Sequence, residues 1–278
     1  MSSDRTPLGD HMKDYERRET GRRMFLELPI YARIDGRSFS KFTKGMTRPY
    51  DQHMSTIMQQ VTKYLVEATC AQVGYTQSDE INLCWTEPNT VFFRGKTQKM
   101  VSTLAALATS KFTLLALEVW PDLVHATPPT FDCRVFQLPT LKEAVSAFTW
   151  RERDATKNAI TMAASTVYSH GELLGKTGSE KQEMLHQKGI NFNNYPDHFK
   201  RGSYFTRQRK LRVLSEAELE KIPEAFRPKG PVERIKIDRL VIPPIDKIRN
   251  KSGVLFRGEA AVLFAEGSLP PESEVDLP

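Results

Sequence analysis

Apolar and polar residues alternate along residues 30–35 with a period of two. The apolar positions are Ile30, Ala32 and Ile34, and the positions between them are Tyr31, Arg33 and Asp35. This period predicts a half-buried strand that carries Asp35 on the face opposite the apolar set. Residues 81–85 alternate in the same way, and Asp79 and Glu80 precede them at a predicted turn. The chain therefore presents two predicted strands with a carboxylate at one end of each.

Apolar residues recur every three or four positions along residues 51–73 and 96–119, which predicts two amphipathic helices. Residues 131–138 have the pattern of a strand, and residues 90–93 are a candidate continuation of the hairpin around Asp79. The order strand, helix, hairpin, helix, strand matches a ferredoxin-like sheet. We therefore predict an α+β fold built like a polymerase palm, an antiparallel sheet with helices on one face, although a fold alone does not establish a function.

The expected organisation is one catalytic unit in two parts. Residues 1–139 form the palm-like catalytic domain, and residues 140–265 form its C-terminal part, which is helical to about residue 174 and then contains a basic hairpin. Residues 266–278 are acidic and rich in Pro, a composition that predicts a disordered tail.

Composition narrows the class of protein only moderately. The 278 residues contain 40 Lys and Arg against 34 Asp and Glu, and the net charge of +6 favours an anionic partner without proving one. Cys70, Cys84 and Cys133 lack the spacing of metal ligands and are typical of small core residues in a reducing compartment. No run of 18 apolar residues and no signal-peptide pattern occurs, so we expect a cytoplasmic protein without a membrane partner.

Asp35 and Asp79 are the candidate chemical centre. Carboxylates at the ends of neighbouring strands would form an all-oxygen site, which Mg²⁺ prefers, and a pair of such ions clamps the attacking and leaving oxygens of nucleotidyl transfer. Taken separately, Asp35-Gly36 is a common turn, and Ser78-Asp79-Glu80 could cap a helix. Their shared position at strand ends, with basic residues on either side, favours the metal site.

Other candidate residues leave two interpretations open. Lys96 and Lys99, near the start of a predicted helix, indicate either an anionic ligand such as a triphosphate or a solvated face. Arg134 is either a buried ion-pair partner or a phosphate ligand. Residues 171–177 look like a P-loop, but the spacing of their glycines is one residue too short and they follow a helix, so a surface turn is the better interpretation.

A basic run begins at Lys200 and Arg201 and continues through Arg207 to residue 212, with Tyr204 and Phe205 within it. Aromatic and Arg side chains together suit phosphates and unstacked bases. An exposed charged hairpin is the competing interpretation, and we favour nucleic acid because phosphate chemistry is already indicated by Asp35 and Asp79.

Four motifs occur in order along the chain. They are Arg33-Ile-Asp-Gly-Arg-Ser-Phe39, Gly74-Tyr-Thr-Gln-Ser-Asp-Glu80, Phe131-Asp-Cys-Arg-Val135, and Ile190-Asn-Phe-Asn-Asn194 with Phe199-Lys-Arg-Gly202 after it. Together they resemble the tRNA(His) guanylyltransferase superfamily, the reverse (3′→5′) nucleotide polymerases. The resemblance extends over residues 8–261, nearly the whole chain.

The resemblance implies a palm with two Mg²⁺ ions, ATP and GTP as substrates, tRNA as the partner, and a homotetramer. Asp35, the backbone carbonyl of Gly36 and Asp79 would bind the metals, with Ser78 and Glu80 supporting the catalytic site. The implied nucleotide-binding residues are Arg33, Gly36, Arg37, Ser38, Phe39, Arg48, Asp51, Lys96 and Lys99, and the amides of residues 36–39 would cradle phosphate oxygens. The implied RNA-binding residues are Arg134, Asn158, Lys200, Arg201 and Arg207.

One segment departs from the family pattern. Histidine-tRNA guanylyltransferases carry His-Ile-Asn-Asn-Leu-Tyr-Asn after a Trp-Arg pair, whereas after Trp150-Arg151 only Asn158 matches that segment cleanly. The departure favours the guanylyltransferase-like branch, which restores missing 5′ nucleotides on truncated tRNAs as directed by the opposite strand. The implied reaction adenylylates the tRNA 5′ end with ATP, and the 3′-hydroxyl of the incoming nucleotide then displaces AMP.

Three alternatives remain open at this stage. The main one is addition of a single guanylate to tRNA(His). A nucleotidyl cyclase would not need the basic run that follows Lys200, and a non-catalytic RNA-binding protein would not need both Asp35 and Asp79.

Overall fold

A six-stranded antiparallel sheet forms the centre of the computed structural model, which describes residues 6–265, so that the predicted tail at 266–278 lies outside the described residues. The strand order is β4-β1-β3-β2-β5-β6. The strands are β1 (Ile30–Gly36), β2 (Val73–Gln77), β3 (Glu80–Trp85), β4 (Phe131–Gln137), β5 (Ser203–Arg212) and β6 (Val232–Leu240).

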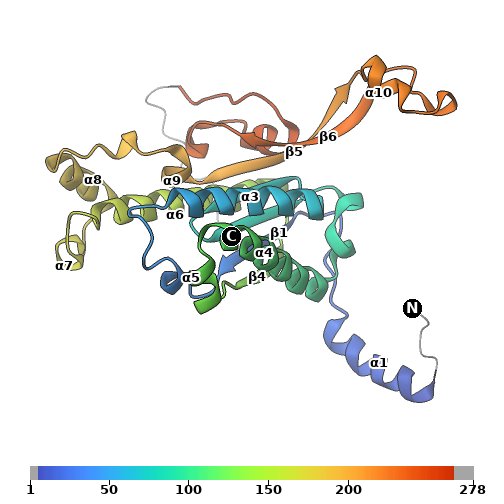
Figure 1. Cartoon of the computed structure of the whole chain (residues 1–278), viewed down its shortest axis with the longest axis horizontal. Coiled ribbons are helices and arrows are strands. Elements are labelled where there is room, and N and C mark those ends of the chain that lie inside the picture. Colours follow the sequence, from blue (N-terminus) through green and yellow to red (C-terminus); the bar gives the residue numbers. More distant parts are fainter. Residues whose placement is uncertain (1–5, 266–278) are drawn as a thin grey trace.

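Helices connect and cover the strands (Figure 1). They are α1 (Pro7–Thr20), α2 (Phe39–Phe42), α3 (Gln52–Thr69), α4 (Thr97–Val119), α5 (Pro121–Ala126), α6 (Leu141–Ala164), α7 (His170–Leu173), α8 (Gly178–Gln187), α9 (Asp197–Arg201) and α10 (Glu216–Glu220). Short 3₁₀ turns occur at Pro88–Thr90, Phe92–Gly95, Phe192–Asn194, Glu224–Phe226 and Ile245–Lys247, and a π-helical turn at Gly253–Arg257.

The first four strands confirm the predicted ferredoxin-like palm. Each of the connections β1-α3-β2 and β3-α4-β4 carries its long helix on the same face of the sheet, where Ile30, Ala32 and Ile34 lie in the main hydrophobic core. The apolar residues of β1 are therefore buried under α3 and α4, as predicted, and Asp35 lies on the opposite face of the sheet, where it is free to make other contacts.

Two predicted elements were wrong in their extent. Residues 90–93 form part of two 3₁₀ turns and do not continue the hairpin, since Pro88 has no N–H to donate to a ladder and Phe93 and Arg94 have positive φ angles of 50° and 51°. The helix expected to reach about residue 174 ends at Ala164. The next residues, Ser165-Thr166-Val167, are poor helix formers, which explains the early end.

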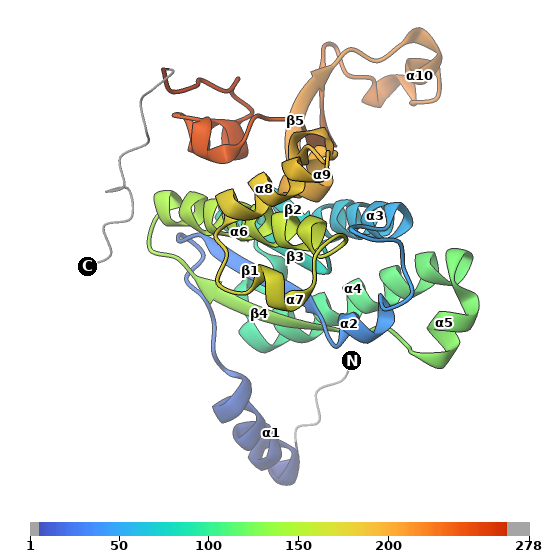
Figure 2. The ribbon, with the colours of Figure 1, turned by 90° about the vertical axis from the view of Figure 1, so that its left-hand side faces the viewer.

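The second face of the sheet is covered in part by α6. Phe148 of this helix packs with Tyr31, Tyr75 and Tyr204 in a second hydrophobic core. The strand β5 pairs with β2, and β6 pairs with β5, so residues after 140 complete the same sheet that the palm begins. Figures 1 and 2 show that α1 extends below this body and that the tip of the β5–β6 hairpin, with α10, extends above it.

One helix, α4, is long and apolar enough to cross a membrane by length and composition alone. In the fold it packs against the sheet, and Met100, Leu104, Ala108 and Phe112 are buried in the main core.

Candidate active site

The ends of β1 and β3 bring the two predicted carboxylates together. Asp35 lies opposite Glu80 of β3 on one side and opposite Asp132 of β4 on the other. Asp79 occupies the tight turn between β2 and β3, and its carbonyl accepts a hydrogen bond of 3.1 Å from the amide of Gly36. This bond ties the turn to the end of β1 beside Asp35.

Gly36 is required by this close approach. A Cβ atom at this position would lie 2.4 Å from the ring of Phe39 and 2.9 Å from Oδ2 of Asp79, so any side chain would displace the carboxylate or the ring. The Asp-Gly pair is therefore more than a common turn, because the absence of a side chain lets Asp79 lie against the backbone of β1.

Both carboxylates have raised pKa values. Burial, and after it the charge of Asp35, raise the pKa of Asp79 to about 6, although hydrogen bonds from its own backbone and from Ser78 act in the opposite direction. Burial, then Glu80 and Asp132, raise the pKa of Asp35, and Arg33 and Arg134 partly offset this effect. Like charges are thus held together in a partly buried place, which is the condition that a bound cation relieves.

The donor set fits Mg²⁺. Across residues 6–265, no group of three or more His, Cys, Asp and Glu could cage a metal. Mg²⁺ seldom uses such a cage, because it binds one or two carboxylates and takes its other ligands from substrate phosphates and water. Asp35 and Asp79 would supply those carboxylates, and neither forms an ion pair within the part of the chain that the structure describes.

Glu80, predicted to support the site, faces a buried arginine. Its side chain accepts two hydrogen bonds of 2.7 Å from Nε and Nη2 of Arg151 in α6, and a third of 2.8 Å from Asn82. The side chains of Glu80 and Arg151 are 7% and 8% exposed. A bidentate pair of this kind fixes α6 against the strand that follows Asp79.

A cavity of about 360 Å³ opens beside Asp79. Ser78 and Asp79 line one side, and Tyr50, His198 and Phe199 line another, with Tyr50 stacked on Phe199 at 4.8 Å. The volume falls in the range of small-ligand sites, and aromatic walls suit a nucleobase. Nε2 of His198 is buried and has no hydrogen-bond partner within the residues described, so a polar group of a ligand could bond to it.

Three predicted residues also line this cavity, with different local roles. Arg48 stands in the loop before α3. Asp51 caps α3, since its carboxylate accepts from the amides of His53 and Met54 at 2.9 and 3.1 Å. Asn158 of α6 donates to Asp154 at 3.2 Å. Each can face a nucleotide, but part of the bonding capacity of Asp51 and Asn158 is already used within the fold.

The expected phosphate cradle needs a correction. The amide of Gly36 donates to Asp79 and that of Arg37 donates to Thr130 at 2.8 Å, so neither is available to a phosphate. The side chain of Phe39 is buried in an aromatic cluster of the core. Of the four amides of residues 36–39, those of Ser38 and Phe39 donate no hydrogen bond to the backbone of the described residues, and Ser38 adopts a left-handed conformation with φ of 57°.

Lys96 and Lys99 lie far from the carboxylates in a single chain. Lys96 forms an isolated β-bridge with Arg23, which precedes β1 in the chain. Lys96 therefore lies near the start of β1, whereas Asp35 lies near its end. The seven residues of β1 span about 20 Å at roughly 3.3 Å each. Both lysines line a groove between α1 and α4 together with Arg17, so their predicted contact with a triphosphate would be at a separate place from Asp79.

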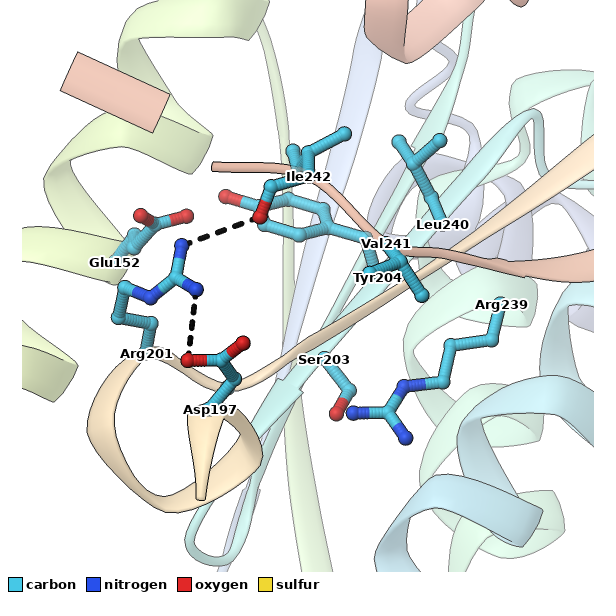
Figure 3. A pocket seen from close by; sticks show the side chains of 10 residues that line it. Glu152, Asp197, Arg201, Ser203, Tyr204, Arg239, Leu240, Val241 and Ile242 are labelled. Carbon is cyan, nitrogen blue, oxygen red and sulfur yellow. Dashed lines mark hydrogen bonds and ion pairs between the residues drawn. The ribbon is translucent and has the colours of Figure 1, made fainter. Parts of the chain in front are cut away.

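Lys200 and Arg201 are engaged in the fold, contrary to the expectation of an open basic run. Arg201 pairs with Asp197 at 2.9 Å and donates to the carbonyl of Ile242 at 3.3 Å (Figure 3). Lys200 pairs with Asp197 at 3.4 Å and donates to the carbonyl of Asn193 at 2.8 Å. Both side chains are only 17% exposed. They hold α9 against its neighbours, which limits them as RNA ligands.

The rest of the basic run leads away from the carboxylates. Ser203 pairs with Thr76, close to the turn that holds Asp79, and β5 then continues towards the distant tip of the hairpin. The cations beyond it are largely neutralised, with Lys210 bound to Asp238 at 2.6 Å. Arg207 is an exception within the described residues, since no ion pair involves it.

Arg207 is consequently the sharpest test of RNA binding by this run. We expect Arg207→Ala to weaken tRNA binding and to reduce the slope of log affinity against log salt by about 1, because each phosphate contact releases counterions. The measurement is a tRNA titration at several salt concentrations. Lys210→Ala is the matched control and should change the slope less. An unchanged slope in Arg207→Ala would show that the run is a solvated face.

Sequence reasoning did not find Arg151 or His198 as members of the site. Arg151 stands in a run of four charged residues on α6, and only its helical spacing of three from Phe148 and four from Ala155 indicates that it faces inward. His198 had no signal, because its neighbours suggested only a loop before the basic run.

Comparisons with known proteins identify the family of this chain. The family model described as tRNAHis guanylyltransferase matches residues 9–139. The solved structure of a bacterial tRNA(His) guanylyltransferase (Thg1)-like protein in complex with ATP is 35% identical, covers 72% of this chain and 88% of its own, and superposes with a TM-score of 0.67. The chain belongs to the tRNA(His) guanylyltransferase family.

More distant members of the family give the same assignment. The tRNA(His) guanylyltransferase of Schizosaccharomyces pombe is 29% identical over 216 residues, which is 72% of this chain and 80% of the relative. The crystal structure of the enzyme from Saccharomyces cerevisiae is 26% identical with a TM-score of 0.60, and covers 72% of this chain and 95% of its own. The family is one of nucleotidyltransferases, so the chain is classed with transferases that act in tRNA processing.

Proposed function

We propose that this chain adds nucleotides to the 5′ end of tRNA in the 3′→5′ direction. The observation that carries the proposal is the meeting of Asp35 and Asp79 at neighbouring strand ends, beside a cavity that fits a nucleotide. Membership of the family supports tRNA as the substrate. ATP and GTP are the proposed nucleotide substrates, because solved structures of bacterial relatives hold one or the other.

The proposed reaction has two steps. The 5′-phosphate of the tRNA attacks the α-phosphate of ATP and releases pyrophosphate, which leaves an adenylylated end. The 3′-hydroxyl of the incoming nucleotide then attacks the tRNA 5′-phosphate, a new phosphodiester bond forms, and AMP leaves. Two bound Mg²⁺ ions would supply Lewis-acid activation of the hydroxyl and neutralisation of the leaving group. Asp35 and Asp79 would hold them, with the backbone carbonyl of Gly36.

The side chains around the carboxylates fit the remaining needs of such a reaction. Arg33 and Arg134 lie on the same sheet face as Asp35, where their charges can face phosphate oxygens. The Glu80–Arg151 pair would position the turn that carries Asp79. The cavity beside Asp79 would receive the base of one nucleotide between the aromatic wall and α6.

We further propose that the added nucleotide is chosen by the opposing base of the tRNA, as in repair of truncated ends. The segment after Trp150-Arg151 supports this choice, since only Asn158 remains of the residues typical of the tRNA(His) enzymes. The alternative is addition of one guanylate to tRNA(His), which the names of the curated relatives favour.

A tRNA that lacks its first nucleotide tests the proposed activity. With a 5′-label, Mg²⁺, ATP and each nucleoside triphosphate in turn, we expect extension by one nucleotide in the reaction that contains the complement of the opposing base. The same mixture with a chelator in place of Mg²⁺ should give none. Absence of extension with all four nucleotides and free Mg²⁺ would contradict the proposal.

The N-terminal helix supports a homo-oligomer, which is a tetramer by family likeness. No residue of α1 is buried within one chain, although Leu8, Met12 and Tyr15 are large apolar side chains on it. A second copy of the chain would cover them.

A further inference from the structure

The carboxylate face of the sheet remains open over β1 and β4, and two aromatic side chains border the opening. Arg33 and Arg134 lie directly opposite each other on these strands. Phe136 follows two residues after Arg134 on the same face and is 38% exposed. Trp150 of α6 is 54% exposed, and the guanidinium of Arg33 lies 5.7 Å from the centre of its ring. Two exposed rings therefore flank a pair of arginines.

The ring of Trp150 is held in place from beneath. The guanidinium of Arg151 lies 4.5 Å from the ring centre, within cation–π distance. Arg151 is itself fixed by its two hydrogen bonds to Glu80, in a pair that is almost completely buried. An exposed ring on an immobile support loses little conformational entropy when a ligand covers it.

Phe136 is supported in a similar way. Its ring lies 5.3 Å from that of Tyr31, which is buried and in turn contacts Phe148 of α6 at 5.0 Å. Along the two strands, the order from the strand ends inward is Asp35 and Asp132, then Arg33 and Arg134, then Tyr31 and Phe136, and the ring of Trp150 lies next to Arg33.

This order matches the chemistry of a nucleotide unit at the end of an RNA chain. Arginines bind phosphate, and exposed aromatic rings stack on unpaired bases with little preference for sequence. A single exposed aromatic side chain would need no explanation. Here two of them, one on a rigid arginine, border the arginines nearest to Asp35.

We propose that Trp150 and Phe136 form a stacking platform for an unpaired base at the acceptor end of the RNA, the base that opposes the missing 5′ nucleotide. The inference rests on the proposed function, and it specifies where the directing base lies. Stacking would hold this base beside Asp35 without reading its identity, so that the identity of the added nucleotide is set by base pairing alone.

Intrinsic fluorescence gives a direct test, because Trp150 is the exposed member of three tryptophans, with Trp85 fully buried and Trp120 half-buried. The probes are two short RNA hairpins, one with a blunt end and one with a single unpaired 3′ nucleotide. We expect the second hairpin to quench the wild-type fluorescence more strongly than the blunt one. Trp150→Phe should lose this difference in quenching and still bind.

The affinities of Trp150→Ala and Phe136→Ala for the same hairpins measure how much each ring contributes to binding. We expect each variant to bind the hairpin with the unpaired nucleotide about tenfold more weakly, because one base–aromatic contact is lost, and to bind the blunt hairpin with little change. Trp150→Phe keeps a stacking ring and should remain close to wild type. Phe226→Ala, an exposed aromatic on the distant hairpin, is the matched control and should bind both hairpins as the wild type does.

Several outcomes would overturn the inference. The first is that Trp150→Ala binds the two hairpins with the same ratio of affinities as the wild type. The second is that GTP alone quenches the fluorescence as strongly as the RNA does. The third is a change of oligomeric state in Trp150→Ala, which would mark the ring as part of an interface between copies. The binding measurement needs no catalysis. If the wild type discriminates between the hairpins but adds no nucleotide, the proposed function fails and the platform stands; if it adds nucleotides and Trp150→Ala discriminates as before, only the platform fails.

Discussion

We expect Asp79→Asn to lose nucleotide addition while the folded protein becomes more stable at pH 7 in the absence of divalent cations. Activity should fall roughly a thousandfold or more. This lies at the upper end of the losses that follow when one electrostatic contact to a transition state is removed. Stability should rise because the pKa of Asp79 in the folded protein is about 6, above its ordinary value of 3.8. Each pKa unit corresponds to about 1.4 kcal/mol, so ionised Asp79 costs at most about 3 kcal/mol.

The sign of the pH dependence follows from the raised pKa. The folded state binds the proton of Asp79 more tightly than the unfolded state does, so the contribution of Asp79 to stability falls as pH rises from about 4 to about 6, and its full cost remains above that range. The advantage of Asp79→Asn should grow over the same range. Urea unfolding at a series of pH values measures it, and Asp132→Asn, on the exposed edge of the same face, should show a much smaller change.

Mg²⁺ should reverse the order of stability. A ligand that binds only the folded state stabilises it, so added Mg²⁺ should raise the unfolding free energy of the wild type and leave that of Asp79→Asn nearly unchanged. A variant that retains substantial activity with saturating Mg²⁺, or that gains as much stability from Mg²⁺ as the wild type, would show that Asp79 is not a metal ligand.

The second large effect is expected at the buried pair of Glu80 and Arg151. Arg151→Met leaves Glu80 without an ion-pair partner in a place that is less than a tenth exposed, and Glu80→Gln leaves Arg151 with the more exposed Asp154 alone, at 3.0 Å. Breaking a buried pair costs about 3–5 kcal/mol. The double variant Glu80→Gln with Arg151→Met should recover most of this loss, because no uncompensated charge remains.

The neighbouring Arg153 provides the matched control for this pair. It forms an ion pair of 2.7 Å with Asp246, but the two side chains are 52% and 35% exposed, so Arg153→Met should cost less than about 1 kcal/mol. Denaturant unfolding of the four variants measures all of these differences. Additive losses in the double variant would mean that Glu80 and Arg151 act independently and that the pair does not hold α6 to β3.

The palm could be predicted from the sequence because the patterns that define its strands and helices each lie within one short segment of the chain. The alternation around Ile34 set the face of β1 on which Asp35 lies, and the long spacing patterns of α3 and α4 gave the order of elements. The meeting of Asp35 with Asp79 followed from that order. The need for Gly36 at their contact depends on the exact approach of the turn, which no local pattern encodes.

The sequence did not show where charged residues lie when their partners are distant or their position depends on the fold. Lys96, singled out by its place near a helix start and by the family resemblance, lies at the other end of β1 from Asp35. Arg151 is buried although the residues around it are charged, because α6 crosses the sheet over Glu80. The pairing of Arg201 with Asp197, four residues earlier on α9, was predictable from helical spacing and was missed in favour of an open RNA surface.

Exchange of the opposing base tests the central claim most directly. The substrates are truncated tRNAs in which the anticodon and the base opposite the missing 5′ nucleotide are varied independently, each incubated with Mg²⁺, ATP and a mixture of the four nucleotides. The account predicts that the added nucleotide is the complement of the opposing base whatever the anticodon. Addition of guanylate only to the tRNA with the histidine anticodon, regardless of the opposing base, would contradict it.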